Sequence, residues 1–316
     1  MEKRRLGRSE LNVPTLCFGG NIFDWTVDKA QGFKLLDGLM EAGFNFIDTA
    51  DVYSRWVEGH VGGESEVVIG EWMKARGNRD KVILATKVGM DLGDGKKGLA
   101  PAYIRQAVEA SLKRLQTDYI DLYQSHTDDA ETPLADTLGA YAKLIEEGKV
   151  RVIGASNYSA ARLAEALETS KKAGLPRYES LQPEYNLYAR EGFEAELGPL
   201  CRKEEVGVIP FFALAAGFLT GKYRSEADYS KSPRGARSIP KYMNERGFRI
   251  LDALDKVAAE AGVPQARVAI AWLISRPGLT APIASATTLE QLSELIAATK
   301  LSLSAEQLAA LDKASG

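Results

Sequence analysis

The amino-acid sequence predicts a single α/β domain over residues 1–316, a (β/α)8 TIM barrel with an N-terminal hairpin and extra C-terminal helices. Eight short stretches with β-preferring side chains alternate with longer helix-like stretches, which is the order of elements in such a barrel. No shift in composition marks a linker, and barrels routinely exceed the usual size of one domain. An open doubly wound sheet is the alternative architecture.

Each element can be placed along the chain. Residues 1–14 suit a hairpin with its turn at Arg8-Ser9-Glu10. Pro101 lies in the first turn of a predicted helix, and Gly148 and Gly174 stop two others. Strands are expected at 15–19, 44–48, 82–87, 119–124, 150–154, 180–183, 206–211 and 279–284. Helices are expected at 29–42, 64–74, 101–115, 133–147, 160–173, 191–205, 249–261, 266–275, 289–299 and 305–311, with a polar loop at 224–242.

Composition and charge exclude several classes of function. Lys and Arg number 40 against 43 Asp and Glu, so the net charge of −3 gives no electrostatic footprint for nucleic acid. The apolar runs are too short to span a membrane, and no signal-peptide core follows the basic N-terminus. Cys17 and Cys201 lie far apart, and the chain has only two histidines, so no metal site is expected. We expect a cytoplasmic protein.

Four ionisable residues fall at the ends of three successive predicted strands. Asp48 ends the second strand, and Tyr53 follows on its loop. Lys87 ends the third strand, and His126 lies just beyond the fourth. Taken singly, such a lysine is usually a solvated loop charge and such a histidine a structural one. Because the carboxyl ends of barrel strands meet at the face where active sites lie, their joint arrival favours a functional site.

The chemistry of these four residues suits the reduction of a carbonyl group. A phenol has a pKa near 10 and is a poor acid at neutral pH. An adjacent ammonium lowers that pKa, which is the role expected of Lys87, held in place by Asp48. His126 would orient and polarise the carbonyl oxygen, and Tyr53 would be its general acid. None of these groups can donate hydride, so a cofactor must supply it.

The same residues resemble the catalytic tetrad of the aldo-keto reductase superfamily. The matching segments are Phe46–Tyr53, Ala85–Lys87 and Asp121–His126, and Gly62–Glu66 is similar to the segment after the family's tyrosine loop. The resemblance covers nearly the whole chain. It implies an NAD(P)H-dependent enzyme that reduces an aldehyde or ketone to an alcohol, reversibly.

The resemblance also implies contacts with the cofactor. Family members hold the nicotinamide carboxamide through residues that match Ser156, Asn157 and Gln182, and stack an aromatic ring on it at the position of Phe211, where tyrosine or tryptophan is usual. The resemblance implies NADP(H) as the cofactor. Arginine is frequent in the family where this chain has Thr287, so the preference for NADP(H) is not expected to be strict, and NAD(H) is expected as a second cofactor. Gly217 and Lys222 belong to a segment that resembles the loop over the pyrophosphate, and Leu214 is a further implied cofactor contact. Ser285, Thr287 and Gln291 are implied around the adenosine 2′-phosphate.

The substrate is expected to be a small aldehyde, ketone or sugar, or the corresponding alcohol. Trp25 and Trp56 would line its site, or they would only pack a loop. A second class of function is a regulatory subunit, because potassium-channel β subunits share this fold and cofactor; the short N-terminus favours the enzyme. His60 is expected to be exposed. Residues 93–98 fit a G-x-G-x-x-G pattern, but Gly93 comes six residues after Lys87 rather than directly after a strand, so we interpret them as a flexible loop.

Overall fold

The computed structural model describes residues 2–316 and confirms the (β/α)8 barrel. The barrel strands run parallel in the order β10-β3-β4-β5-β6-β7-β8-β9. The backbone N–H groups of Thr280 and Ile283 donate to Val208 O and Pro210 O, each at 2.8 Å, and so join the two ends of the sheet. The strands are β3 (Cys17–Gly19), β4 (Phe46–Asp48), β5 (Ile83–Val88), β6 (Ile120–Ser125), β7 (Val150–Ser156), β8 (Tyr178–Gln182), β9 (Gly207–Val208) and β10 (Ile283–Ala284).

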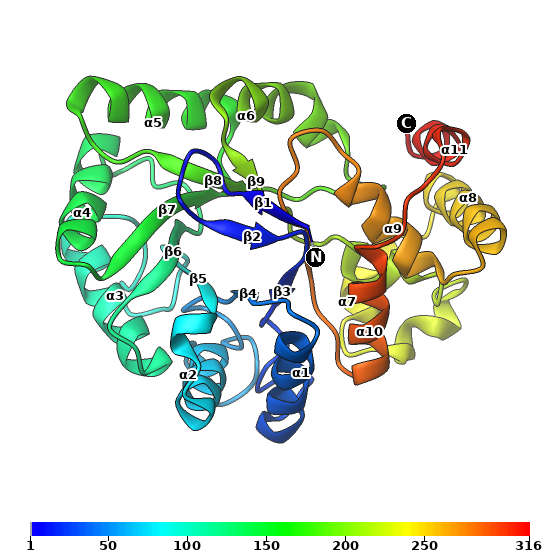
Figure 1. Cartoon of the computed structure of the whole chain (residues 1–316), viewed down its shortest axis with the longest axis horizontal. Helices are drawn as coiled ribbons and strands as arrows, with labels where there is room; N and C mark the ends of the chain where they lie inside the picture. Colours follow the sequence, from blue (N-terminus) through cyan, green and yellow to red (C-terminus); the bar gives the residue numbers. More distant parts are fainter. Residues whose placement is uncertain (1) are drawn as a thin grey trace.

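Helices surround this sheet (Figure 1). Several begin at a residue whose side chain accepts a hydrogen bond from the first turn, as Asp28, Ser159, Thr288 and Ser304 do. The long helices are α1 (Lys29–Glu41), α2 (Glu64–Arg76), α3 (Pro101–Leu115), α4 (Leu134–Glu146), α5 (Ala160–Ala173), α6 (Gly198–Glu204), α8 (Glu245–Ala261), α9 (Gln265–Ile274), α10 (Leu289–Ala298) and α11 (Ala305–Ser315). The short ones are η1 (Arg79–Lys81), η2 (Phe193–Leu197), η3 (Ala215–Thr220), η4 (Glu226–Lys231), α7 (Gly235–Ser238) and η5 (Pro240–Tyr242).

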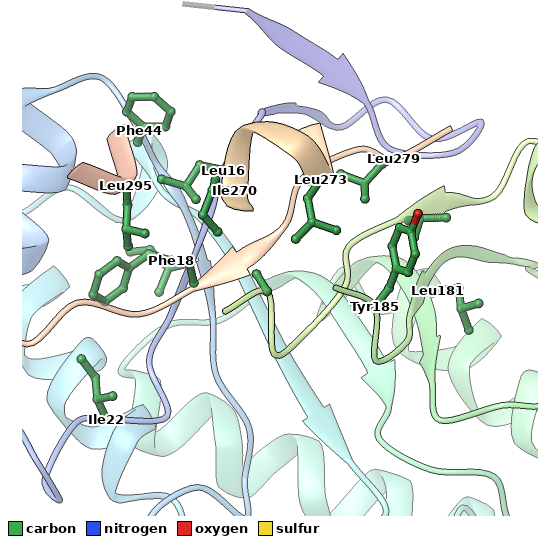
Figure 2. Close-up of a cluster of buried hydrophobic side chains, with 14 of the residues drawn as sticks. Leu16, Phe18, Ile22, Phe44, Leu181, Tyr185, Ile270, Leu273, Leu279 and Leu295 are labelled. Carbon is green, nitrogen blue, oxygen red and sulfur yellow. The ribbon is translucent and has the colours of Figure 1, made fainter. Parts of the chain in front are cut away.

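Two apolar cores fix which side chains face the barrel interior. The larger core lies between strands and helices, and Figure 2 draws part of it, including Phe18 of β3 and Leu295 of α10. The smaller core fills the barrel interior, where Phe46, Ala85 and Leu122 belong to one cluster. Because side chains alternate along a strand, the residues two positions further on also point inward. These residues are Asp48, Lys87 and Gln124.

The predicted N-terminal hairpin closes one end of the barrel. Its strands β1 (Lys3–Arg5) and β2 (Asn12–Pro14) pair antiparallel, and Figure 1 shows them lying across the ring of strands. Leu6, Leu11 and Val13 are buried in the interior cluster. Burial of these apolar side chains keeps water out of this end. The hairpin leaves the opposite rim, at the carboxyl ends of the strands, uncovered, and this is the open rim.

Several predicted boundaries were wrong for identifiable reasons. The strands expected at 206–211 and 279–284 are shorter, since Pro210 and Pro282 have no N–H to donate to a ladder. The helix expected at 191–205 begins as a π-helical turn, and the one expected at 249 begins at Glu245 because Asn244 caps it. The polar loop at 224–242 contains η4, α7 and η5, and a capping box between Ser225 and Asp228 starts the first of them.

Two further features bear on function. Within residues 2–316 no single helix is long and apolar enough to cross a membrane; α8 and α9 pass that test only as a pair, and they meet at a 95° bend. In the same part of the chain no group of three or more His, Cys, Asp or Glu side chains is placed to hold a metal ion. Cys17 and Cys201 are both buried and free.

Candidate active site

The structure brings the four predicted residues together around the Lys87 ammonium. Its Nζ donates to Asp48 Oδ2 at 2.6 Å, to Thr49 O at 2.7 Å and to Tyr53 Oη at 2.9 Å. These three acceptors use all of the ammonium's donors. The Tyr53 ring lies edge-on to the His126 ring, with 5.9 Å between centroids. The four side chains therefore form one connected group at the open rim.

Register and loop contacts set the positions of these side chains. Asp48 of β4 lies opposite Ala85, two residues before Lys87 on β5, so the carboxylate and the ammonium meet inside the barrel. Tyr53 follows on the loop after β4, where its N–H donates to Ala50 O at 3.3 Å. The next residue, Ser54, has a positive φ of 72° and its hydroxyl donates to Phe23 O at 2.7 Å. This anchored turn holds the phenol over the strand ends.

Two glutamines complete the surroundings of the Asp48 carboxylate. Gln124 Nε2 donates to Asp48 Oδ1 at 3.2 Å, and Gln182 Nε2 donates to the same oxygen at 3.0 Å. Sequence reasoning assigned Gln182 to the cofactor and gave Gln124 no role. The spacing in the sequence could have indicated that Gln124 lies in the site. It precedes His126 by two residues and therefore points to the same side of the strand.

Burial changes the acid strength expected of Tyr53. Loss of solvent raises the pKa of its phenol to about 12, while the Lys87 charge acts to lower it and Asp48 to raise it. The lowering by Lys87 was predicted correctly, but the expectation of a net lowered pKa was wrong because burial outweighs it. Burial also disfavours the Lys87 ammonium, yet Asp48 and Tyr53 leave the pKa of Lys87 raised. At neutral pH the pair is therefore a protonated phenol beside an ammonium.

The imidazole of His126 is neutral in this setting. Burial, and then the positive charge of Lys87, hold the pKa of His126 well below its usual range. Its backbone N–H donates to Val88 O at 2.8 Å, and its carbonyl accepts from Asn157 Nδ2 at 2.9 Å. Nδ1 has no hydrogen-bond partner among residues 2–316. A neutral imidazole fixed by its backbone can offer a hydrogen bond to an oxygen of a bound molecule.

Part of the predicted cofactor set lies beside the tetrad. Ser156 ends β7 and Gln182 ends β8, and the Ser156 hydroxyl donates to Gln182 O at 2.9 Å. Asn157 Nδ2 donates to Ser156 Oγ at 3.2 Å. The half-buried Phe211 follows β9, and its N–H donates to Pro183 O at 2.9 Å. Amide and hydroxyl groups next to a partly open ring suit a flat ring that carries a carboxamide.

The other predicted cofactor residues lie on two loops. Leu214 precedes η3, Gly217 within it has a φ of 94°, and Lys222 is exposed with no ion pair in residues 2–316. After β10, Thr287 donates through N and Oγ1 to Gln291 Oε1, at 2.9 and 3.1 Å, where α10 begins. An unpaired ammonium and a helix N-terminus are both suited to phosphate. The Ser285 hydroxyl instead donates to Gly19 O at 2.7 Å.

The two tryptophans predicted to line the substrate site lie next to Tyr53. Trp56 is 45% exposed, and its ring centroid is 6.1 Å from that of Tyr53. Trp25 packs edge-on against Trp56 at 5.3 Å. They therefore pack their loops and also form an aromatic wall beside the phenol. His60, expected to be exposed, is partly buried instead, and its Nε2 lies 3.7 Å from Asp24 Oδ2.

Comparison with known proteins agrees with this geometry. The family model described as "Aldo/keto reductase family" matches residues 15–315. An uncharacterized oxidoreductase, YrpG of Bacillus subtilis, is 35% identical over 99% of this chain and 95% of its own length. Norsolorinic acid reductase stcV of Emericella nidulans is 34% identical over 95% of this chain and 76% of its own length. A probable voltage-gated potassium channel subunit beta of Arabidopsis thaliana is 33% identical over 93% of this chain and 90% of its own length.

Proposed function

This chain belongs to the aldo/keto reductase family, and we propose that it reduces an aldehyde or ketone to an alcohol, reversibly, with NADP(H) or NAD(H). One observation carries the proposal: a buried ammonium, Lys87, bonds at once to the Asp48 carboxylate and to the Tyr53 phenol at the open rim of the barrel. A buried charge needs such partners, and the protonated phenol lies with its ring edge-on to the neutral imidazole of His126. Besides a hydride, carbonyl reduction needs a proton donor and a hydrogen bond to the carbonyl oxygen, which the phenol and the imidazole can supply.

In this mechanism each residue has a separate task. Tyr53 gives its proton to the carbonyl oxygen as that oxygen gains electrons, and takes a proton back in the reverse direction. Lys87 favours the phenolate that remains, since it already donates to Tyr53 Oη. Neutral His126 donates a hydrogen bond that orients the carbonyl oxygen. The reduced nicotinamide, when bound, supplies the hydride.

The residues of the rim fit a dinucleotide. Ser156, Asn157 and Gln182 would hold the carboxamide, and Phe211 would stack on the nicotinamide ring. Gln182 would contact the carboxamide while its amide also donates to Asp48, which ties cofactor binding to the tetrad. Leu214, Gly217 and Lys222 would lie along the pyrophosphate, and Ser285, Thr287 and Gln291 near the adenosine 2′-position.

A substrate panel tests the proposal. Aldehydes, ketones and sugars are offered to the purified protein with NADPH or NADH, and loss of reduced cofactor is followed by absorbance. We expect turnover with part of the panel. Tyr53→Phe should reduce kcat by roughly 10²–10⁴-fold, since positioned proton transfer contributes that much, and should leave cofactor binding intact. A Tyr53→Phe variant with wild-type kcat on a substrate limited by chemistry would show that another group gives the proton.

A second candidate is a cofactor-binding regulatory subunit. The similarity to a probable potassium channel subunit beta supports it. A subunit of that kind would use the rim to hold the cofactor rather than to turn it over. This candidate function therefore predicts tight NADPH binding with no turnover on any carbonyl tested. Recovery of the chain bound to a membrane protein would favour this candidate.

A further inference from the structure

An arginine without a partner lies beside the aromatic wall of the active site. Arg234 is half-buried, and no residue in 2–316 forms an ion pair or a side-chain hydrogen bond with it. Its guanidinium carbon lies 4.7 Å from the centroid of the Trp25 ring. A guanidinium carries five donors, and none of those of Arg234 is used within residues 2–316, so they are free for a bound ligand. Such a group is suited to an anion from outside the chain.

A continuous row of rings connects this arginine with the catalytic phenol. Arg234 stacks on Trp25, Trp25 packs on Trp56 at 5.3 Å, and Trp56 lies 6.1 Å from Tyr53. The phenols of Tyr53 and Tyr223 act to raise the pKa of Arg234, although burial lowers it overall. Arg234 and Tyr53 are therefore within electrostatic reach of each other, and an arginine stays charged at neutral pH.

The segment that carries Arg234 is held firmly. Gly235 N donates to Ser232 O at 3.0 Å, and a side chain at Gly235 would lie 1.8 Å from the carbonyl oxygen of Tyr229. The Ser232 hydroxyl is 2.7 Å from that of Tyr223, which is fully buried. The backbone that carries Arg234 is therefore placed in advance, and contact with the Trp25 ring positions the guanidinium, which lowers the entropy cost of binding.

Three acidic side chains, one next to Trp25 and two paired with lysines of segment 224–242, have partners other than Arg234. Asp24, next to Trp25, faces His60 at 3.7 Å. Asp228 pairs with Lys231, and Glu184 lies 3.9 Å from Lys241. None of these carboxylates lies within ion-pair distance of Arg234 in the described chain. The positive charge at the end of the aromatic wall is left uncompensated.

We propose that Arg234 is a specificity-determining residue that binds a carboxylate of the substrate, so that the preferred substrates are carbonyl compounds with a carboxylate separated from the reacting carbonyl by an apolar spacer. This inference rests on the proposed function. The spacer would lie along Trp25 and Trp56 while Tyr53 meets the carbonyl. A guanidinium binds a carboxylate through two parallel hydrogen bonds, which adds orientation as well as affinity.

A phosphate of the cofactor is the other anion that Arg234 could meet. The geometry favours the substrate, because Arg234 contacts Trp25 of the wall beside Tyr53, whereas the exposed Lys222 lies on the loop expected to cover the pyrophosphate. The two sources predict different effects of a substitution. Loss of a substrate contact changes only molecules that carry the carboxylate, while loss of a phosphate contact weakens the cofactor for every substrate.

The test compares 4-carboxybenzaldehyde with its neutral methyl ester. Wild type and Arg234→Gln are assayed for KM and kcat with both aldehydes, and NADPH binding is measured by fluorescence. We expect Arg234→Gln to raise KM for the acid by roughly ten- to a hundred-fold, as for the loss of a hydrogen bond to a charged group, with little change for the ester. Arg234→Lys should keep part of the preference. Arg237→Gln is the matched control and should keep all of the preference, because Arg237 is an exposed arginine on α7, which begins directly after Arg234.

Calorimetry with the alcohol products separates this inference from the proposed function. The acid product and its methyl ester are titrated into the protein with NADP+ present, which needs no turnover. Acid binding that depends on Arg234 in a protein without turnover would support the carboxylate site and reject the enzyme. An acid preference that is absent, or that survives Arg234→Gln, would overturn the inference. Weaker NADPH binding with equal effects on acid and ester would assign Arg234 to a cofactor phosphate and also overturn it.

Discussion

Replacing Lys87 by methionine tests the ammonium on which the candidate site depends. Lys87→Met keeps an unbranched side chain of similar length but removes hydrogen bonds to Asp48, Thr49 and Tyr53. Asp48 is only 1% exposed, so its charge would remain buried without a counterion. Breaking one side of a buried pair costs about 3–5 kcal/mol. We expect a loss of unfolding free energy at the lower end of this range, because Gln124 and Gln182 still donate to Asp48.

The same substitution should impair turnover. Lys87 is the group that limits the rise in the pKa of Tyr53, which burial sets at about 12. Without the ammonium that pKa rises further, and phenolate becomes harder to form. We expect kcat to fall by roughly 10²–10⁴-fold, the usual contribution of proton transfer. Alcohol oxidation, which needs the phenolate as base, should lose at least as much as carbonyl reduction. Steady-state rates in both directions measure this.

A double variant separates stability from catalysis. Lys87→Met combined with Asp48→Asn removes both charges, so urea unfolding should show that most of the lost stability returns. Turnover should stay low, because Tyr53 still lacks its ammonium. Wild-type kcat in the double variant would refute the catalytic role of Lys87. A single Lys87→Met variant as stable as wild type would refute the argument that the buried pair must be kept whole.

Two further predictions concern cofactor choice and pH. Thr287→Arg should lower KM for NADPH without changing kcat, since a guanidinium can bind the 2′-phosphate bidentately; kcat/KM with NADPH and NADH measures it, and a wild type that already prefers NADPH by about four powers of ten would contradict it. Both carboxylate oxygens of Asp51 are buried without partners, and burial, with the charge of Glu66, raises its pKa to about 8. The folded chain thus holds a proton that the unfolded chain releases, so this group makes stability fall as pH rises from about 4 to about 8. Asp51→Asn should lessen that fall in urea unfolding at about pH 5 and pH 8, and an unchanged fall would contradict the assignment.

The sequence was enough to predict the barrel and to predict which four ionisable side chains meet at one of its rims. Alternating strand-like and helix-like stretches predict a barrel because each strand can return to a parallel neighbour only through a crossover. In a barrel the carboxyl ends of all strands share one rim. Residues at those ends, such as Asp48, Lys87 and His126, can therefore be brought together by counting along the chain. Expected boundaries were wrong where a proline or an N-cap outweighed the apolar pattern, as at Pro210 and Asn244.

The electrostatics and the walls of the site became visible only once the folded chain was known. The pKa of Tyr53 depends on how much water its surroundings exclude, which no local pattern records, and burial there outweighs the nearby ammonium. The bonds from Gln124 and Gln182 to Asp48 join residues from three strands. Arg234 and Trp25 lie about two hundred residues apart in the sequence, yet they stack. Desolvation and long-range contacts depend on which surfaces pack together, and packing is settled only when the whole barrel has closed.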